Sequence, residues 1–163
     1  HYEAEIAVLI GKPLSKTPDA EEVLDAISGF APVLDLTLRE VQDQLKAKGY
    51  PWEVAKSFDG ACVLAPFVPG DALTDLTDIG IRLSLNGVVR QDGNSRDMLN
   101  PILPLIQHIC GQFSLQAGDV VLTGTPAGVG KLADGDLLEL ELVGQAGFTT
   151  RVVQATVKAQ GEA

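Results

Sequence analysis

The first ten residues alternate between the two faces of a predicted strand, which ends at Gly11. Successive side chains of a strand point to opposite faces, so residues two positions apart share a face. Glu3 and Glu5 therefore lie on the same side of this strand. The run that follows them, residues 6–10, is too apolar for a solvated edge strand, so the two carboxylates lead into a buried segment.

Two helices and a second strand are predicted in the first third of the chain. Thr-Pro at 17–18 is typical of an N-cap followed by proline at the first helical position, and Gly29 is the expected end of that helix. Residues 30–36 are predicted to form a short buried strand. The sequence Thr-Leu-Arg-Glu at 37–40 matches a capping box, which predicts a second helix over about residues 38–48.

The rest of the chain is predicted to contain mainly strands and turns. Residues 62–77 are rich in proline, glycine and aspartate, which favours a surface loop. Asn-Gly at 86–87 separates two alternating segments and predicts a hairpin. A helix is predicted to start at Asn-Pro 100–101, with an apolar stripe that begins at residue 102. The predicted strands are residues 81–85, 88–91, 119–123, 137–143 and 148–157.

The fold class follows from this order of elements. Strands outnumber helices, and the chain has neither an internal repeat nor a linker. The pattern predicts an α+β fold dominated by a mixed or antiparallel sheet that can curl into a barrel. With 163 residues, of which 45% are hydrophobic, the chain is expected to form one catalytic domain over residues 1–163.

Composition narrows the classes of partner. The net charge of −10, without a basic cluster, argues against nucleic acid and anionic membranes as partners. No apolar run reaches the roughly 20 residues that span a bilayer. Cys62 and Cys110 are too few for a disulfide framework and are predicted to be free thiols in a reducing cytosol, which suggests a cytoplasmic protein.

Three carboxylates in the first third of the chain suggest a metal site. Two neighbouring anions in an apolar setting are costly unless a cation joins them. Asp35 lies at the predicted strand-to-helix junction and would add a third carboxylate to Glu3 and Glu5, giving the all-oxygen ligand set that a hard divalent ion prefers. The alternative is a solvated strand face, which is the usual setting of a Glu-x-Glu pair. Lys56 would reverse the local field for an acidic ligand, although it could also be a surface lysine.

Two further groups of residues are candidates for ligand contacts. Arg39 and Gln42 lie three residues apart and share the helix face nearest Asp35, although this face could equally be an exposed first turn. The glycine-rich segment 124–130 could simply form tight turns. It could also bring backbone N–H groups and the Thr125 hydroxyl close to an oxyanion or carboxylate. It lacks the Lys-Ser/Thr ending of a phosphate-binding P-loop.

These motifs, in this order, resemble the fumarylacetoacetate hydrolase family, and the resemblance extends from the first residue to about Val152. Within this family, Pro-Trp at 51–52 is similar to the branch that acts on acylpyruvates and oxaloacetate. The matching segments are residues 1–5, 34–42, 56–59, 86–87, 90–93 and 118–126.

The resemblance implies a mostly β, barrel-like fold and a homodimer. It also implies that Glu3, Glu5 and Asp35 hold Mg²⁺ or Mn²⁺ and that Lys56 is catalytic. The side chains implied to contact the substrate are Arg39, Gln42, Lys56 and Thr125.

The sequence departs from the family pattern in three places. Val63 stands where proline is common, and Asn100 replaces a usual apolar or aromatic residue. The His-Glu pair that activates water in the family belongs to an upstream lid helix, and we expect that this short segment is omitted from the sequence. His108 is predicted to be an ordinary residue on the flank of its helix, and His1 is a candidate for indirect support of the site.

The predicted function is metal-dependent hydrolysis of the C–C bond of acylpyruvates, which are 2,4-dioxo acids such as fumarylpyruvate or acetylpyruvate. The products would be pyruvate and a carboxylic acid. An alternative is keto–enol tautomerisation or decarboxylation of oxaloacetate, because the same ion and Lys56 would stabilise its enolate. A third hypothesis is a catalytically silent metabolite-binding subunit. Lys56 and the Thr-Gly-Thr-Pro segment count against it, since such a subunit would not need them.

Overall fold

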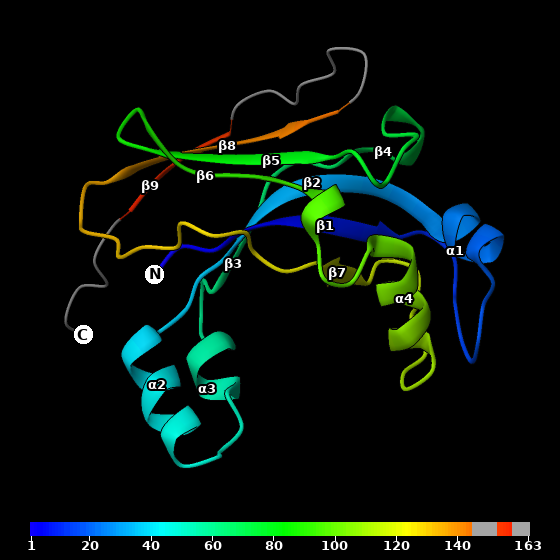
Figure 1. The fold of residues 1–163 in the computed structure, drawn as a ribbon, viewed down its shortest axis with the longest axis horizontal. Coiled ribbons are helices and arrows are strands. Elements are labelled where there is room, and N and C mark those ends of the chain that lie inside the picture. Colours follow the sequence, from blue (N-terminus) through cyan, green and yellow to red (C-terminus); the bar gives the residue numbers. More distant parts are fainter. Residues whose placement is uncertain (145–152, 158–163) are drawn as a thin grey trace.

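The protein consists of two antiparallel sheets with helices at their ends (Figure 1). The computed structural model describes residues 1–144 and 153–157. The first sheet has the order β3-β2-β1-β7, and β4 also pairs with β2. Its strands are β1 (Ala4–Ile10), β2 (Ile27–Asp35), β3 (Cys62–Leu64), β4 (Val68–Pro69) and β7 (Val120–Leu122). The second sheet has the order β6-β5-β8-β9, formed by β5 (Gly80–Leu85), β6 (Val88–Asn94), β8 (Leu137–Val143) and β9 (Val153–Thr156).

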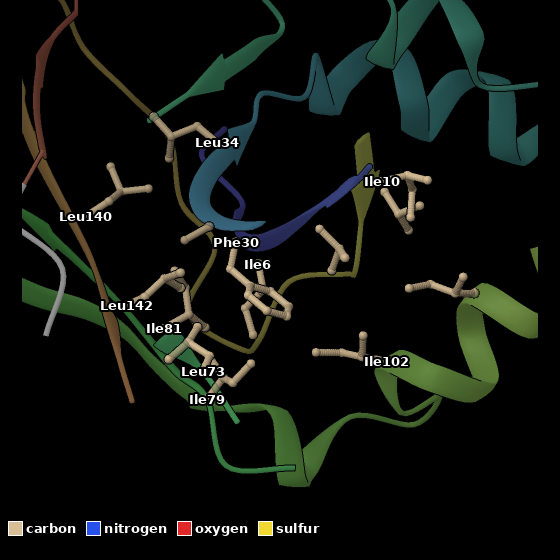
Figure 2. Close-up of a cluster of buried hydrophobic side chains, with 14 of the residues drawn as sticks. Ile6, Ile10, Phe30, Leu34, Leu73, Ile79, Ile81, Ile102, Leu140 and Leu142 are labelled. Atoms are coloured by element: carbon tan, nitrogen blue, oxygen red, sulfur yellow. The ribbon is translucent and has the colours of Figure 1, made fainter. Parts of the chain in front are cut away.

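Every strand pairing in the described residues is antiparallel, and the strongly curved β2 gives the first sheet the shape of a half-barrel (Figure 1). This confirms the α+β, mostly β prediction and selects the antiparallel alternative. The main core lies between the sheets (Figure 2). One face of β1 supplies Ala4, Ile6, Val8 and Ile10 to this core. The other face carries Glu3 and Glu5, so alternation along β1 separates the core from the candidate site.

The helices lie at opposite ends of the first sheet (Figure 1). They are α1 (Ala20–Ala26), α2 (Arg39–Ala47), α3 (Glu53–Lys56) and α4 (Ile102–Cys110), with short 3₁₀ turns η1 (Gly70–Ala72) and η2 (Ser95–Asp97). Within the described residues, none of the helices has the length and hydrophobicity needed to cross a membrane. The predicted opening strand, the hairpin and the helix after Pro101 are confirmed. Asn86 and Gly87 have the positive φ values, 52° and 76°, that a primed hairpin turn requires.

The first helix is shorter than predicted at both ends. It is capped by Asp19, not by Thr17, because Asp19 and Glu22 form a reciprocal capping box at 2.9 Å in each direction. Gly29 lies inside β2 and does not end the helix. A Cβ at Gly29 would come within 2.7 Å of the Val68 carbonyl oxygen, so glycine there permits the close approach of β4.

Two other local predictions are wrong. The capping box predicted at 37–40 does not form: α2 begins after Leu38 without a side-chain cap, and the Thr37 hydroxyl bonds Lys56 instead. The predicted loop 62–77 contains β3, β4 and η1, because β2 is long enough to pair with both short strands. Of the last predicted strand, residues 153–156 form β9, while residues 148–152 lie outside the described residues.

Candidate functional site

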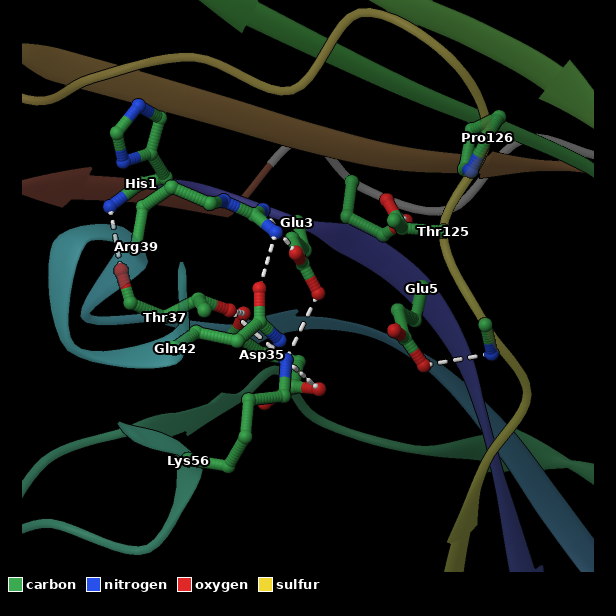
Figure 3. Close-up of polar contacts among 12 residues, drawn as sticks. His1, Glu3, Glu5, Asp35, Thr37, Arg39, Gln42, Lys56, Thr125 and Pro126 are labelled. Atoms are coloured by element: carbon green, nitrogen blue, oxygen red, sulfur yellow. Dashed lines mark hydrogen bonds and ion pairs between the residues drawn. The ribbon is translucent and has the colours of Figure 1, made fainter. Parts of the chain in front are cut away.

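The three candidate carboxylates meet at one end of the first sheet (Figure 3). Asp35 is the last residue of β2, and its N–H donates to the carbonyl oxygen of Glu3 at 2.9 Å. This pairing places Asp35 beside Glu3, while Glu5 follows on the same face of β1. One oxygen from each carboxylate lies within 4.8 Å of the others. Glu3 and Glu5 are only 8% and 4% exposed, so the site is sheltered from water.

Two cationic side chains from α2 and α3 face these carboxylates. The Lys56 ammonium lies 2.8 Å from Glu3 Oε2 and 2.6 Å from Asp35 Oδ2, and it donates to Thr37 Oγ1 at 2.8 Å. The Arg39 guanidinium donates to Glu3 Oε1 and also to Gln42 Oε1, the latter at 2.6 Å. The site therefore places three carboxylates against two cations.

Burial and hydrogen bonding act differently on the two glutamates. Burial raises the pKa of Glu3, but hydrogen bonds from Lys56 and Arg39 outweigh it, so the pKa lies below its ordinary value. Burial raises the pKa of Glu5 to about 7, with further contributions from Asp35 and Glu3, despite the bond from Gly124. Burial lowers the pKa of Lys56, but bonds to Asp35 and Glu3 outweigh that effect and leave the pKa above its ordinary value.

The donor set fits a hard divalent ion. All three groups are carboxylates, two of them are buried, and they converge closely enough to share one cation. Glu3 and Asp35 each contact a cationic side chain, whereas Glu5 receives a hydrogen bond from the backbone N–H of Gly124 at 2.7 Å. The buried carboxylate of Glu5 is thus the part of the cluster that an ion would stabilise most.

The glycine-rich loop after β7 lies along the free edge of β1. Gly124 has a φ of 97°, which glycine tolerates, and this turn directs its N–H at Glu5. The Thr125 hydroxyl donates to the Ala4 carbonyl oxygen at 2.9 Å. A Cβ at Gly128 would come within 2.1 Å of the Arg90 carbonyl oxygen, so this glycine lets the loop pack against β6. The loop thus uses glycine for a tight turn and brings one backbone N–H to the carboxylate of Glu5, while the Thr125 hydroxyl bonds a backbone carbonyl oxygen.

Gln91 is a functional candidate that the sequence analysis did not single out. It lies on β6, is 1% exposed, and its amide bonds Ala4, Thr125 and Pro126. Its burial, and hence its need for hydrogen-bond partners, is visible in the structure but not in the sequence. Its partners are 34 to 87 residues away in sequence and could not be inferred from spacing.

Two hollows border this region. One, of about 260 Å³, is lined by His1, Thr37 and Arg39 together with Lys131. The backbone nitrogen of His1 donates to the Thr37 carbonyl oxygen at 2.8 Å, so this residue supports the segment between β2 and α2. A larger cavity, of about 510 Å³, lies along the Thr123–Ala127 loop and includes Ile6, on the core face of β1, but none of the three carboxylates.

His108, Glu139 and Glu141 lie away from the carboxylate cluster, whereas Cys62 borders it. His108 is exposed on α4, at the far end of the sheet from α2 and α3 (Figure 1). Glu139 and Glu141 lie on β8 of the second sheet, on the face opposite its buried leucines. Cys62 pairs with Asp35 across β3 and β2, and burial together with Asp35 and Glu5 raises the pKa of its thiol.

Comparison with known proteins gives consistent matches. The family model described as fumarylacetoacetate (FAA) hydrolase C-terminal matches residues 1–153. Oxaloacetate tautomerase YcgM of Escherichia coli is 48% identical over 154 residues, which cover 94% of this chain and 69% of the relative.

Solved structures support the fold. A putative fumarylacetoacetate isomerase/hydrolase from Oleispira antarctica is 51% identical with a TM-score of 0.90, covering 95% of this chain and 69% of that one. Fumarylpyruvate hydrolase from Pseudomonas aeruginosa, solved in complex with Mn²⁺ and pyruvate, is 27% identical with a TM-score of 0.87. That match covers 98% of this chain and 66% of the hydrolase.

Proposed function

Because the chain belongs to the fumarylacetoacetate hydrolase family of enzymes, we propose that it catalyses the keto–enol tautomerisation of oxaloacetate with Mg²⁺ or Mn²⁺. The observation that carries this choice is the 48% identity to an oxaloacetate tautomerase, against 27% to a fumarylpyruvate hydrolase. This was the alternative prediction from sequence, and acylpyruvate hydrolysis becomes the second candidate. The Mn²⁺ and pyruvate held by the distant hydrolase support a 2-oxo acid substrate.

Substrate binding would depend on cations in an otherwise acidic protein. The chain has a net charge of −10, so a dicarboxylate needs a local reversal of the field. The Arg39 guanidinium, held by Gln42, offers planar N–H donors suited to a carboxylate. The Lys56 ammonium adds a second positive charge close to the carboxylate cluster.

Glu3, Glu5 and Asp35 would hold the divalent ion, which supplies Lewis-acid polarisation of the 2-oxo group when bound. Lys56 Nζ would stabilise negative charge on the 2-oxygen as the enolate forms. Keto and enol oxaloacetate share this enolate and differ only in whether a proton resides on C3 or on the 2-oxygen. A site that stabilises the enolate therefore lowers the barrier between them.

Hydrolysis of an acylpyruvate makes a further demand, because a base must activate water. Within the described residues, the three clustered carboxylates are assigned to the ion, and His108 lies on exposed α4. Tautomerisation needs no hydrolytic water. Tautomerisation still requires a proton to move between C3 and the 2-oxygen, so the choice between the two reactions rests on the sequence identities.

The remaining predictions concern the setting of the enzyme. A homodimer is expected from the family resemblance, and a cytoplasmic location is expected from the free thiols Cys62 and Cys110. A small 2-oxo acid remains the proposed partner, with no role for nucleic acid or membrane. These proposals are supported by the family resemblance, the cysteine count and the net charge.

The test compares three reactions of the same protein with Mg²⁺. Enol oxaloacetate, preequilibrated oxaloacetate and acetylpyruvate are supplied in turn, and products are followed by NMR. We expect rapid conversion of the enol, slower release of pyruvate from oxaloacetate and little cleavage of acetylpyruvate. Acetylpyruvate cleavage faster than enol conversion would contradict the proposal and favour the hydrolase.

A further inference from the structure

The amide of Gln91 completes the hydrogen bonding of β1 at the point where β7 diverges from it. β7 pairs with β1 only over Ala7–Leu9. Beyond this stretch, the Ala4 N–H donates to Gln91 Oε1 at 2.9 Å. Gln91 Nε2 donates to the Pro126 carbonyl oxygen and to Thr125 Oγ1, both at 2.9 Å. One side chain from the second sheet thus joins the strand that carries the carboxylates to the loop that carries Thr125.

The chemistry of these partners fixes the orientation of the amide. A backbone N–H can only donate, so the group facing Ala4 must be the Gln91 oxygen. A carbonyl oxygen can only accept, so the group facing Pro126 must be the NH₂. The second hydrogen of that NH₂ is then directed at the Thr125 hydroxyl oxygen.

The same reasoning fixes the direction of the Thr125 hydroxyl. Its hydrogen is directed at the Ala4 carbonyl oxygen, which can only accept. One of the two lone pairs of Thr125 Oγ1 accepts from Gln91. The remaining lone pair is the only hydrogen-bonding capacity left on this hydroxyl, so Thr125 Oγ1 can accept from a ligand but cannot donate to one without breaking a bond.

We propose that Thr125 meets a ligand as an acceptor and recognises the hydroxyl group of an enol, and that Gln91 is the positioning residue that holds the Thr125 hydroxyl against the Ala4 carbonyl oxygen. This inference rests on the proposed function and names the tautomer that Thr125 favours. The 2-hydroxyl of enol oxaloacetate is a donor, whereas the 2-oxo group of the keto form only accepts. Thr125 can therefore pair with the enol and not with the keto oxygen.

The other predicted substrate contacts have the opposite character. Arg39 and Lys56 only donate, and Gln42 directs its oxygen at Arg39, which leaves its NH₂ for a ligand. These three side chains suit the carboxylates of a substrate. Of the four side chains predicted to contact the substrate, Thr125 alone can offer a ligand an acceptor without also offering a donor.

The test uses two ligands that are not turned over. Tartronate carries a hydroxyl donor between its carboxylates, whereas oxalate carries only acceptors. Their dissociation constants are measured by calorimetry on Mg²⁺-loaded protein. Thr125→Val should weaken tartronate binding about fivefold, within the roughly two- to tenfold expected for one neutral hydrogen bond, and should change oxalate binding less than twofold. Thr125→Ser, which keeps the hydroxyl, should retain the tartronate preference.

Gln91→Met tests the positioning role separately. Without the amide, only the Ala4 carbonyl oxygen still holds the Thr125 hydroxyl, so the hydroxyl can shift from this partner and turn toward an acceptor on the ligand. The ratio of tartronate to oxalate affinity should therefore fall at least twofold, together with thermal stability. Equal weakening of both ligands would mean that Gln91 has only a structural role and would overturn the proposal. If Gln91→Met does not fold, Thr125→Val decides, and unchanged tartronate binding overturns the proposal.

The outcomes also separate this inference from the proposed function. Turnover of enol oxaloacetate with an unaltered affinity ratio in Thr125→Val would leave the tautomerase standing and remove the role of Thr125. A shifted ratio in a protein that does not convert oxaloacetate would keep the recognition of a hydroxyl and remove the tautomerase.

Discussion

Replacing Lys56 with methionine removes one positive charge from the site while keeping most of the aliphatic side chain. The Lys56 ammonium lies 2.8 Å from Glu3 Oε2 and 2.6 Å from Asp35 Oδ2. In the proposed reaction it stabilises charge that is greatest in the enolate, so its loss should lower kcat more than it raises KM. Removal of one such electrostatic contact typically costs about 10²–10³-fold in kcat, and we expect a loss in this range for Lys56→Met.

The same substitution should lower stability in a way that a metal ion reverses. Without Lys56, two carboxylates lose their shared donor, at a cost of about 1–3 kcal/mol for the groups left unpaired. The lysine side chain is 24% exposed, which favours the lower part of that range. An ion at about 100 times its dissociation constant adds about 2.7 kcal/mol to the folded state. Thermal unfolding of Lys56→Met should therefore recover with Mg²⁺, while kcat should not.

A matched control is available on the surface. Lys12 pairs with Asp25 at 2.7 Å, but its side chain is 61% exposed. Lys12→Met should change the free energy of unfolding by less than about 1 kcal/mol and leave kcat unaltered. Stopped-flow decay of enol absorbance gives kcat and KM for both variants. A Lys56→Met enzyme with the kcat of the parent would refute the assignment of Lys56 to the reaction.

Three further predictions concern the ion and the substrate. Asp35→Ala should weaken Mn²⁺ binding on the order of a hundredfold, since loss of even an outer-shell partner costs 10–100-fold, and unchanged affinity in calorimetry would remove Asp35 from the ligand set. Because the pKa of Glu5 is raised to about 7 from 4.5, the ion-free folded state holds a proton that the unfolded chain has lost, so stability should fall as pH rises between these values. Mn²⁺ must displace that proton, so its affinity should rise about tenfold per unit up to about pH 7 and then level off, whereas a pH-independent affinity would argue against Glu5 as a ligand. Arg39→Met should raise KM for oxaloacetate roughly 10-fold or more through loss of a charged hydrogen bond, with a smaller change in kcat; steady-state kinetics in which only kcat falls would contradict a binding role.

Features governed by local periodicity were predictable from the sequence. Alternation along β1 placed Glu3 and Glu5 together, and the antiparallel pairing of β1 with β2 brought Asp35 beside them. The hairpin was predictable because Asn86 and Gly87 tolerate the positive φ values that the turn needs. The alternation and the hairpin depend on neighbours within a few residues, whereas the placement of Asp35 also requires the pairing of β1 with β2.

Features governed by distant partners were not predictable in this way. Thr37 occupies the position of a helix cap in the sequence, but its hydroxyl accepts a hydrogen bond from Lys56. This contact exists only after α2 and α3 have packed beside the site. Gln91 bonds Ala4 and Thr125, and a single sequence carries no record of which residues will surround a buried amide. Gly29 was assigned to a helix end, although its actual constraint is the close approach of β4.

In the proposed reaction, a divalent ion and Lys56 act together on the enolate of oxaloacetate. The decisive measurement is the rate at which enol absorbance decays in stopped flow, with Mg²⁺ present and after its removal by EDTA. We predict catalysis with Mg²⁺, its loss with EDTA and its recovery when Mg²⁺ or Mn²⁺ is restored. Enol decay at the uncatalysed rate in the Mg²⁺-loaded protein, or full catalysis in EDTA, would contradict the account.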